Sequence, residues 1–247
     1  MSENQNIPWK RIAVEAAAIV ASILLAFAID TWWDNRNETI LERELLAVLQ
    51  IEFKQNVNLL RDASDSYETQ YLDARNLLAY LDGTSDSSNS AELERLVRSL
   101  WEAKSVHLET GAYDAAAASG DLRLISDNEL RSHLAAWPSY VTEWAEEEAG
   151  LFQYRRNFLM PYMFGKIRTR TIAPNYAPFP DGQSPPRIPR TALDTDALTA
   201  SIVSVEFDNL VTLRAQNTWF AMRDCETLIS RATKIINLIQ TNLDGQR

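Results

Sequence analysis

The chain has 247 residues, of which 46% are hydrophobic, so it is long enough to bury a core in one large or two small domains. Its 24 Lys+Arg and 34 Asp+Glu give a formal net charge of −10, which disfavours a surface for nucleic-acid phosphates, and we expect no nucleic-acid partner. Glycine is scarce, at 7 residues, and a single cysteine, Cys225, excludes an internal disulfide framework. This composition favours an all-α fold.

The first predicted element is an apolar segment near the N-terminus. Between Ile12 and Ile29 the only charged residue is Glu15, and the only other polar residue is Ser22. At about 1.5 Å per helical residue, a segment of this length approaches the thickness of about 30 Å that a bilayer core has. We therefore expect a transmembrane helix over residues 12–33, after a short tail over residues 1–11.

The flanks of this segment are typical of a membrane span. Lys10 and Arg11 precede it, whereas Asp30 and Asp34 lie at its other end, so the positive-inside rule places the tail in the cytoplasm and residues 34–247 outside. Tryptophans stand where the two membrane interfaces are expected: Trp9, Trp32 and Trp33.

Two other readings of the segment remain open. The sequence Ala26-Phe27-Ala28 fits the small-x-small pattern of a signal-peptide cleavage site, which would remove the segment from the mature chain. A buried core helix is the second alternative, although core helices rarely stay apolar over such a length between tryptophans.

A helical projection places small and polar residues of the segment on one stripe. The stripe consists of Arg11, Glu15, Ala18, Ser22 and Ala26. Small residues at this spacing let transmembrane helices approach closely, so we expect a packing face for a second copy or for another membrane protein. Glu15 either pairs with Arg11 one turn earlier or contacts the partner helix.

No glycine or proline occurs between Trp9 and Asp82, so the membrane helix can continue directly into a helical stalk. Apolar residues at helical spacing predict one buried face, with Glu42 and Lys54 largely off it. This face holds Leu45, Leu49, Phe53, Val57 and Leu60. The polar residues 62–66 are expected to break or bend the helix, and residues 83–90 form a polar loop.

The middle of the chain predicts several shorter helices. A cap at Asn89 precedes a helix whose apolar face contains residues 93, 96, 97 and 100, and an alanine-rich helix over residues 112–119 ends at Gly120. Ser126 and Glu129 have the spacing of a capping box. Two prolines then interrupt the helical pattern, with a kink expected at Pro138 and a helix end near Pro161.

Six of the nine prolines lie in residues 174–189, so we expect a proline-rich loop over residues 166–192. Helix resumes at Thr191 or Asp194, and the last helix carries a seam with steps of four and three residues. The seam consists of Ala221, Cys225, Leu228, Ala232, Ile235 and Ile239. In this setting Cys225 is expected to be a small buried hydrophobe.

We find no motif for catalysis, phosphate binding or dinucleotide binding, and we expect no enzymatic activity, no cofactor and no metal. Glu129 and His133 lie four residues apart and are expected to form a surface hydrogen bond or ion pair. The one local cationic cluster is expected either to pair with neighbouring helices or to contact lipid headgroups or an acidic partner. It consists of Arg155, Arg156, Lys166, Arg168 and Arg170.

Three segments together resemble a family of bacterial single-pass inner-membrane proteins of uncharacterised function. They are ILLAFAIDTWWDNRNE continuing into LERELLAVLQIEFKQNVNLL, then AYDAAAASGDLRLISDNELRSHLAAW, and the C-terminal helix from Val205-Glu206-Phe207. The proline-rich part, residues 138–190, departs from the pattern. The resemblance implies an inner-membrane anchor with a helical periplasmic domain, and it transfers no catalytic residue.

The sequence thus predicts a transmembrane helix that continues into a stalk and an extracytoplasmic bundle of about four to six helices. We expect a membrane-anchored, non-enzymatic interaction or scaffold protein of the bacterial envelope, in contact with the lipid bilayer and with a second copy or another membrane protein. The alternative is a small-molecule sensor that acts through a partner subunit. An enzyme assembled from distant helices is the third possibility.

Overall fold

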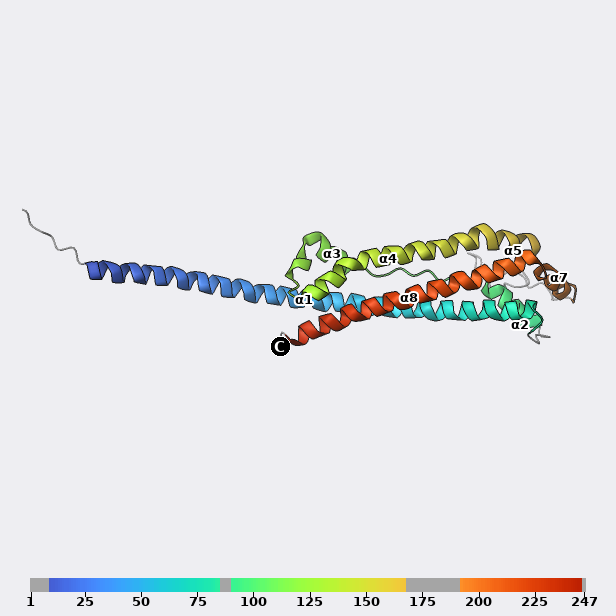
Figure 1. Ribbon diagram of the computed structural model, residues 1–247, viewed down its shortest axis with the longest axis horizontal. Coiled ribbons are helices and arrows are strands. Elements are labelled where there is room, and N and C mark those ends of the chain that lie inside the picture. Colours follow the sequence, from blue (N-terminus) through green and yellow to red (C-terminus); the bar gives the residue numbers. More distant parts are fainter. Residues whose placement is uncertain (1–8, 85–89, 168–191, 246–247) are drawn as a thin grey trace, which may run out of the picture.

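A computed structural model of the chain describes residues 9–84, 90–167 and 192–245 (Figure 1). All regular elements in these residues are helical, which confirms the all-α fold class. They are α1 (Trp9–Leu81), α2 (Ser90–Ser99), α3 (Gly111–Ser119), the 3-10 turn η1 (Asp121–Leu124), α4 (Asn128–Tyr154), the π-helical turn η2 (Arg155–Leu159), α5 (Met160–Lys166), α7 (Ala192–Ile202) and α8 (Val205–Gly245).

The N-terminal apolar segment and the expected stalk form one helix, α1, of 73 residues. At about 1.5 Å per residue it is roughly 110 Å long. Figure 1 shows that its N-terminal part projects beyond the bundle, while its C-terminal part forms one edge of it. The break expected at residues 62–66 is wrong, because Ala63 packs fully buried in the core while Asp62 and Asp65 face solvent, so the helix loses nothing by continuing.

Helices α4 and α8 lie along α1 (Figure 1). Helix α8 runs antiparallel to both, so the C-terminus lies near the point where α1 leaves the bundle. All six residues predicted for the seam of α8 are buried. On α1 the predicted face is also buried, except that Leu46 takes the fully buried position and Leu45 is only partly buried.

A second core cluster lies at the end of the bundle far from the projecting part of α1, where α2, α5 and α7 gather (Figure 1). It includes the four apolar residues predicted for α2: Leu93, Leu96, Val97 and Leu100. The expected cap Asn89 and most of the proline-rich loop, with Thr191, Arg168 and Arg170, lie outside the described residues. Helix α7 begins at Ala192, so Asp194 is inside it.

Between α2 and α3, residues 101–110 form an extended strap that returns along the bundle (Figure 1). Ten extended residues span up to about 35 Å, whereas ten helical residues span only about 15 Å. The extended form therefore lets a short segment connect α2 to α3 along the bundle, and the three long helices are completed by a strap in place of a fourth helix.

The backbone groups of the strap bond to side chains of the long helices. The Asn56 amide on α1 pairs with both backbone groups of Glu109, and Tyr67 Oη donates to the Lys104 carbonyl at 3.0 Å. From α4, Glu148 accepts the N–H of Val106 at 3.1 Å. Since buried backbone groups need partners, these side chains replace the bonds that a helix would have made internally.

Two buried carboxylates of α1 hold the turns near α3. Glu52 accepts the N–H groups of Ala112 and Tyr113 at 2.6 and 3.1 Å, and Glu42 accepts the N–H of Ser126 at 2.5 Å. Glu42 was predicted off the apolar face, and this is wrong, because it is 5% exposed. Its charge is accommodated there by these donors.

The capping box predicted at Ser126 is also wrong. Asp127 is the cap of α4, and its carboxylate accepts the N–H groups of Glu129 and Leu130. Ser126 lies one residue before this cap, and both its N–H and its hydroxyl donate to Glu42. By contrast, α3 ends at Gly120 as predicted, since this residue has a left-handed φ of 80° that favours glycine.

The helical path does not end at Pro161. Helix α4 continues through Pro138, and beyond it the π-helical turn η2 leads directly into α5, whose first turn contains Pro161. Proline has no N–H and crowds the carbonyl four residues earlier, and a wider π turn relieves both constraints. The helix therefore ends at Lys166, next to the extended residue Ile167.

Candidate functional site

The projecting part of α1 is the first candidate site. Among the described residues, α1 is the one helix long and apolar enough to cross a membrane by length and composition. Its most apolar 18-residue window has a mean hydropathy of 1.5 and has none of its residues buried. Large side chains of this part are more than half exposed: Ile19, Val20, Ile23, Leu24, Leu25, Phe27 and Ile29.

The residues predicted for the packing stripe all lie on α1. Glu15, Ala18, Ser22 and Ala26 are exposed, and the Ser22 hydroxyl donates to the Ala18 carbonyl at 2.8 Å. That internal bond satisfies the hydroxyl in an apolar surrounding without a partner helix. For Arg11 only the helical backbone is described, so its expected pairing with Glu15 stays a prediction.

The interface tryptophans of the predicted outer end, Trp32 and Trp33, are 59% and 65% exposed. Their ring centroids lie 6.4 Å apart with tilted planes, so the two indoles are neighbours on the exposed surface of α1. For Trp9 only its place in the helix is described. The sites named from the sequence thus all lie on α1.

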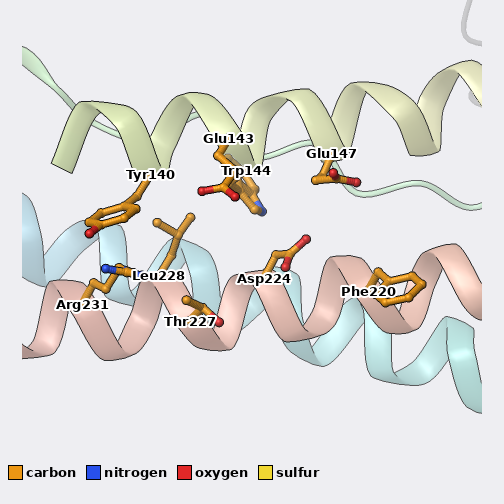
Figure 2. A pocket seen from close by; sticks show the side chains of 9 residues that line it. All are labelled: Tyr140, Glu143, Trp144, Glu147, Phe220, Asp224, Thr227, Leu228 and Arg231. Atoms are coloured by element: carbon orange, nitrogen blue, oxygen red, sulfur yellow. The ribbon is translucent and has the colours of Figure 1, made fainter. Parts of the chain in front are cut away.

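The second candidate is an open groove between α4 and α8, with a volume of about 440 Å³ (Figure 2). Two carboxylates from α4 and one from α8 lie around it, and aromatic rings form part of its walls. The lining residues are Tyr140, Glu143, Trp144, Glu147, Phe220, Asp224, Thr227, Leu228 and Arg231. No sequence motif pointed to this groove, because its residues come from two helices that are far apart in the sequence.

The electrostatics of this groove favour positive charge. Burial raises the pKa of Asp224, and the nearby carboxylates Glu147 and Glu143 raise it further, against a smaller opposite effect of Arg223. At one end Arg231 lies 3.4 Å from the ring centroid of Tyr140 (Figure 2), and this one cation is outnumbered by the three carboxylates among the lining residues. An organic cation with an apolar body fits such walls.

A third candidate is a groove of about 710 Å³ beside η2, lined by Arg155, Arg156, Phe152 and Phe164 among others. Arg155 from the predicted cationic cluster donates to the Trp101 carbonyl of the strap at 2.7 Å. Its guanidinium also lies 5.5 Å from the Phe152 ring centroid. Arg155 is therefore committed to backbone and aromatic contacts.

The most buried charge is Arg214 on α8, which is 0% exposed. Its Nη2 donates to the Glu102 carbonyl of the strap at 2.6 Å and to Gln70 of α1. Within the described residues its Nε and Nη1 have no hydrogen-bond partner. Burial, together with the charge of Arg155, lowers the pKa of Arg214 to about 10, and the side chain fastens three segments of the bundle at one point.

The titratable residues considered in the sequence analysis lie either in surface ion pairs or in the core. His133 Nε2 lies 3.9 Å from Glu129, and Lys234 of α8 lies 2.8 Å from the same carboxylate, which gives a surface ion-pair group. Cys225 is fully buried, and burial raises the pKa of its thiol to about 12. In the described part of the chain, no group of three or more His, Cys, Asp or Glu is placed to hold a metal ion.

Comparison with known proteins finds no matching family model, no similar curated protein and no similar solved structure. What the chain does is therefore inferred from its own surfaces.

Proposed function

We propose that the protein is a membrane-anchored, non-enzymatic helical interaction or scaffold protein of the bacterial envelope. The observation that carries the proposal is the continuity of α1, which passes without a break from a fully exposed apolar segment into the packed bundle. A helix that is both anchor and bundle element connects the two parts rigidly.

The exposed segment supports a lipid environment because its apolar surface is unfavourable in water. Moving one large apolar side chain out of water is worth about 2 kcal/mol, and seven such side chains between Ile19 and Ile29 are more than half exposed. A bilayer covers all sides of a single helix at once. The backbone polar groups of the segment are satisfied within the helix, as a membrane requires.

The charges at the two ends support one orientation. Lys10 and Arg11 favour a cytoplasmic tail over residues 1–11, while Asp30 and Asp34 favour the outer side. In this arrangement the domain over residues 34–247 lies in the periplasm or outside the cell. The family resemblance of the sequence implies the same inner-membrane placement.

The rigid connection determines where the bundle acts. From Trp33 to Leu81 the helix rises about 70 Å, so the bundle extends far from the membrane surface along a fixed axis. The grooves and exposed faces of the bundle then lie at fixed distances from the membrane surface, which suits contacts with other envelope components. The packing stripe with Glu15 adds a contact surface inside the bilayer.

Substitution inside the segment tests the anchor. Val20→Arg combined with Leu24→Arg places two cations near the centre of the span, each costing about 3 kcal/mol on insertion. Parent chain and the control Gln55→Arg, an exposed position of α1 within the bundle, are expected in the membrane pellet after a carbonate wash. The double variant is expected in the soluble fraction or as degraded chain. A parent chain found in the soluble fraction would contradict the anchor.

The groove of Figure 2 favours a second candidate function, the sensing of a small organic cation through a partner subunit. Burial and the neighbouring carboxylates Glu147 and Glu143 raise the pKa of Asp224, and a bound ammonium group would offset this effect. A thermal-shift series of the full chain in detergent with spermidine and with choline tests it. Binding raises Tm with ligand concentration, and Asp224→Asn should abolish the shift. An unchanged Tm with both compounds would count against this candidate.

A further inference from the structure

Two adjacent arginines, Arg155 and Arg156, line the groove beside η2. The strap adds Ser105, and most of the other lining residues are apolar. The apolar ones are Ala145, Ala149, Phe152, Met160, Pro161 and Phe164. The groove volume of about 710 Å³ lies within the range of about 300–1,000 Å³ in which proteins hold small organic molecules. This groove thus combines positive charge with walls for an apolar body.

The positive charge at this point has no ion-pair partner among the described residues. None of their carboxylates forms an ion pair with Arg155, Arg156 or Arg214. Arg155 donates to the Trp101 carbonyl of the strap at 2.7 Å. Arg214 donates to the next carbonyl, that of Glu102, at 2.6 Å. Because a carbonyl accepts hydrogen bonds but carries no charge, two guanidinium groups lie close together without a carboxylate bound to either.

Both of these arginines also have buried N–H groups that no acceptor in the described part of the chain binds. They are Nε of Arg155 and both Nε and Nη1 of Arg214, whose side chain is 0% exposed. Burial lowers the pKa of each, and the charge of Arg156 lowers that of Arg155 further, as Arg155 does for Arg214. Since buried charges and donors are normally paired, the arrangement favours the approach of an anion.

One carboxylate, that of Glu148, does line the groove. Its Oε1 lies 3.1 Å from the Val106 nitrogen and 3.2 Å from Tyr67 Oη, so this oxygen is directed at the strap and at α1. Burial raises the pKa of Glu148, which favours the neutral form. Glu148 precedes Arg155 by about two helical turns, or about 10 Å, so an anion beside the arginines does not contact it.

We propose that the groove beside η2 binds a small organic anion that carries a carboxylate or sulfonate on an aromatic body. The acidic group contacts Arg155 and Arg156, since a guanidinium fork matches two oxygens of such a group. The aromatic body packs against Phe152 and Phe164. This site is separate from the membrane anchor and from the acidic groove between α4 and α8, and it goes beyond the function proposed above.

The position of the groove favours a dissolved anion over a lipid headgroup. Arg214, which lies next to Arg155, also bonds to Gln70 of α1. With α1 anchored as proposed, Gln70 lies about 55 Å beyond Trp33 along the helix. Headgroups of the membrane that holds the anchor do not reach this distance.

Calorimetric titration of the full chain in phosphatidylcholine nanodiscs tests the charge and the body of the anion. The probe is naphthalene-2-carboxylate, with empty nanodiscs as blank for partition into lipid. Naphthalene-2-carboxamide has nearly the same shape without the charge, and acetate has the charge without the ring. Naphthalene-2-carboxylate should bind saturably and at least about tenfold tighter than either, because charge-assisted hydrogen bonds and ring burial act together. Absence of saturable binding, or equal binding of the carboxamide, would overturn the proposal.

Substitutions test whether naphthalene-2-carboxylate lies in this groove. Arg156→Gln removes a cation at an exposed position and should weaken its binding at least about tenfold, whereas Arg156→Lys keeps the charge and should lose less. Ala149→Trp fills the groove from an exposed position of α4 and should weaken binding as much.

The matched control is Arg61→Gln, which removes an exposed arginine of α1 outside the groove and should leave the affinity within about twofold. Melting curves of each variant check that the bundle stays folded. Unchanged affinity in Arg156→Gln or in Ala149→Trp would place naphthalene-2-carboxylate elsewhere and overturn the site. The anchor is unaffected by either result, since every variant is measured in the membrane-inserted chain.

Discussion

The side-chain amide of Asn56 forms two hydrogen bonds with the backbone of Glu109. Its Nδ2 donates to the Glu109 carbonyl at 2.7 Å, and its Oδ1 accepts the Glu109 N–H at 2.7 Å. A neighbouring β-strand would form the same pair of hydrogen bonds with this backbone. Here a single side chain, which is 0% exposed, forms both. Asn56 therefore joins the strap to α1.

Replacing Asn56 should destabilise the bundle strongly. Asn56→Ala leaves two backbone groups of the strap without partners, and each buried unsatisfied group costs about 1–3 kcal/mol. We expect a loss of about 3 kcal/mol in the free energy of unfolding, measured by urea unfolding of the detergent-solubilised chain. Asn58→Ala, at an exposed position two residues later, serves as control and should change it by less than about 0.5 kcal/mol. Equal effects of the two variants would contradict the role of Asn56.

Loss of the charge of Glu52 should also destabilise the bundle. Its carboxylate accepts two N–H groups at the start of α3, where a negative charge also complements the helix dipole. Glu52→Gln turns an NH2 group toward one of these donors, and we expect about 1–3 kcal/mol of destabilisation. Hydrogen exchange should show lost protection of the Ala112 and Tyr113 amides. The control is Glu44→Gln, at an exposed position, and in this variant the protection of the two amides should stay at the parent level.

The groove between α4 and α8 makes stability depend on pH. The folded-state pKa of Asp224 is raised, so its burial is tolerated when it is protonated and becomes unfavourable as pH rises through that pKa. Asp224→Asn should therefore raise Tm at pH 7, and the gain should vanish below the ordinary pKa of an aspartate. The measurement is a series of melting curves from pH 3 to about 8. A gain that persists unchanged at the acidic end would show that charge is not its cause.

The elements with regular apolar spacing were predictable from the sequence. The seam of α8 and the apolar face of α2 are buried as their spacing indicates, because helical periodicity places such residues on one side. Gly120 also ends α3 as expected, since its left-handed backbone suits glycine. Local signals of this kind depend on neighbours within two or three turns.

The strap and its anchors were not predictable in the same way. Residues 101–110 have no period, and their hydrogen bonds come from Asn56, Tyr67 and Glu148, which are far away in sequence. Glu42 lies seven residues before Leu49, on the buried side of α1. Its spacing therefore indicated a buried position, but a charged residue is usually expected to be exposed. The acidic groove could not be predicted either, because it forms only where α4 packs against α8, and no local sequence pattern specifies that pairing.

The thiol of Cys225 should react only after unfolding. It is fully buried, and burial raises its pKa to about 12, so at pH 8 it stays protonated and shielded. We expect labelling by a maleimide to be at least about a hundredfold slower in native chain than in denatured chain. Mass spectrometry of the labelled protein measures both rates. Fast labelling of the native chain would show that the seam of α8 opens easily.

The anchor, the orientation and the retention of the N-terminal segment are tested together by labelling from outside the cell. Two single-cysteine chains are made in the Cys225→Ala background, Ser2→Cys in the tail and Gln55→Cys on the exposed side of α1. Spheroplasts treated with a membrane-impermeant maleimide should label Gln55→Cys at once and Ser2→Cys only after the membrane is opened. Labelling of Ser2→Cys from outside, protection of Gln55→Cys, or a mature chain without Ser2 would contradict the account.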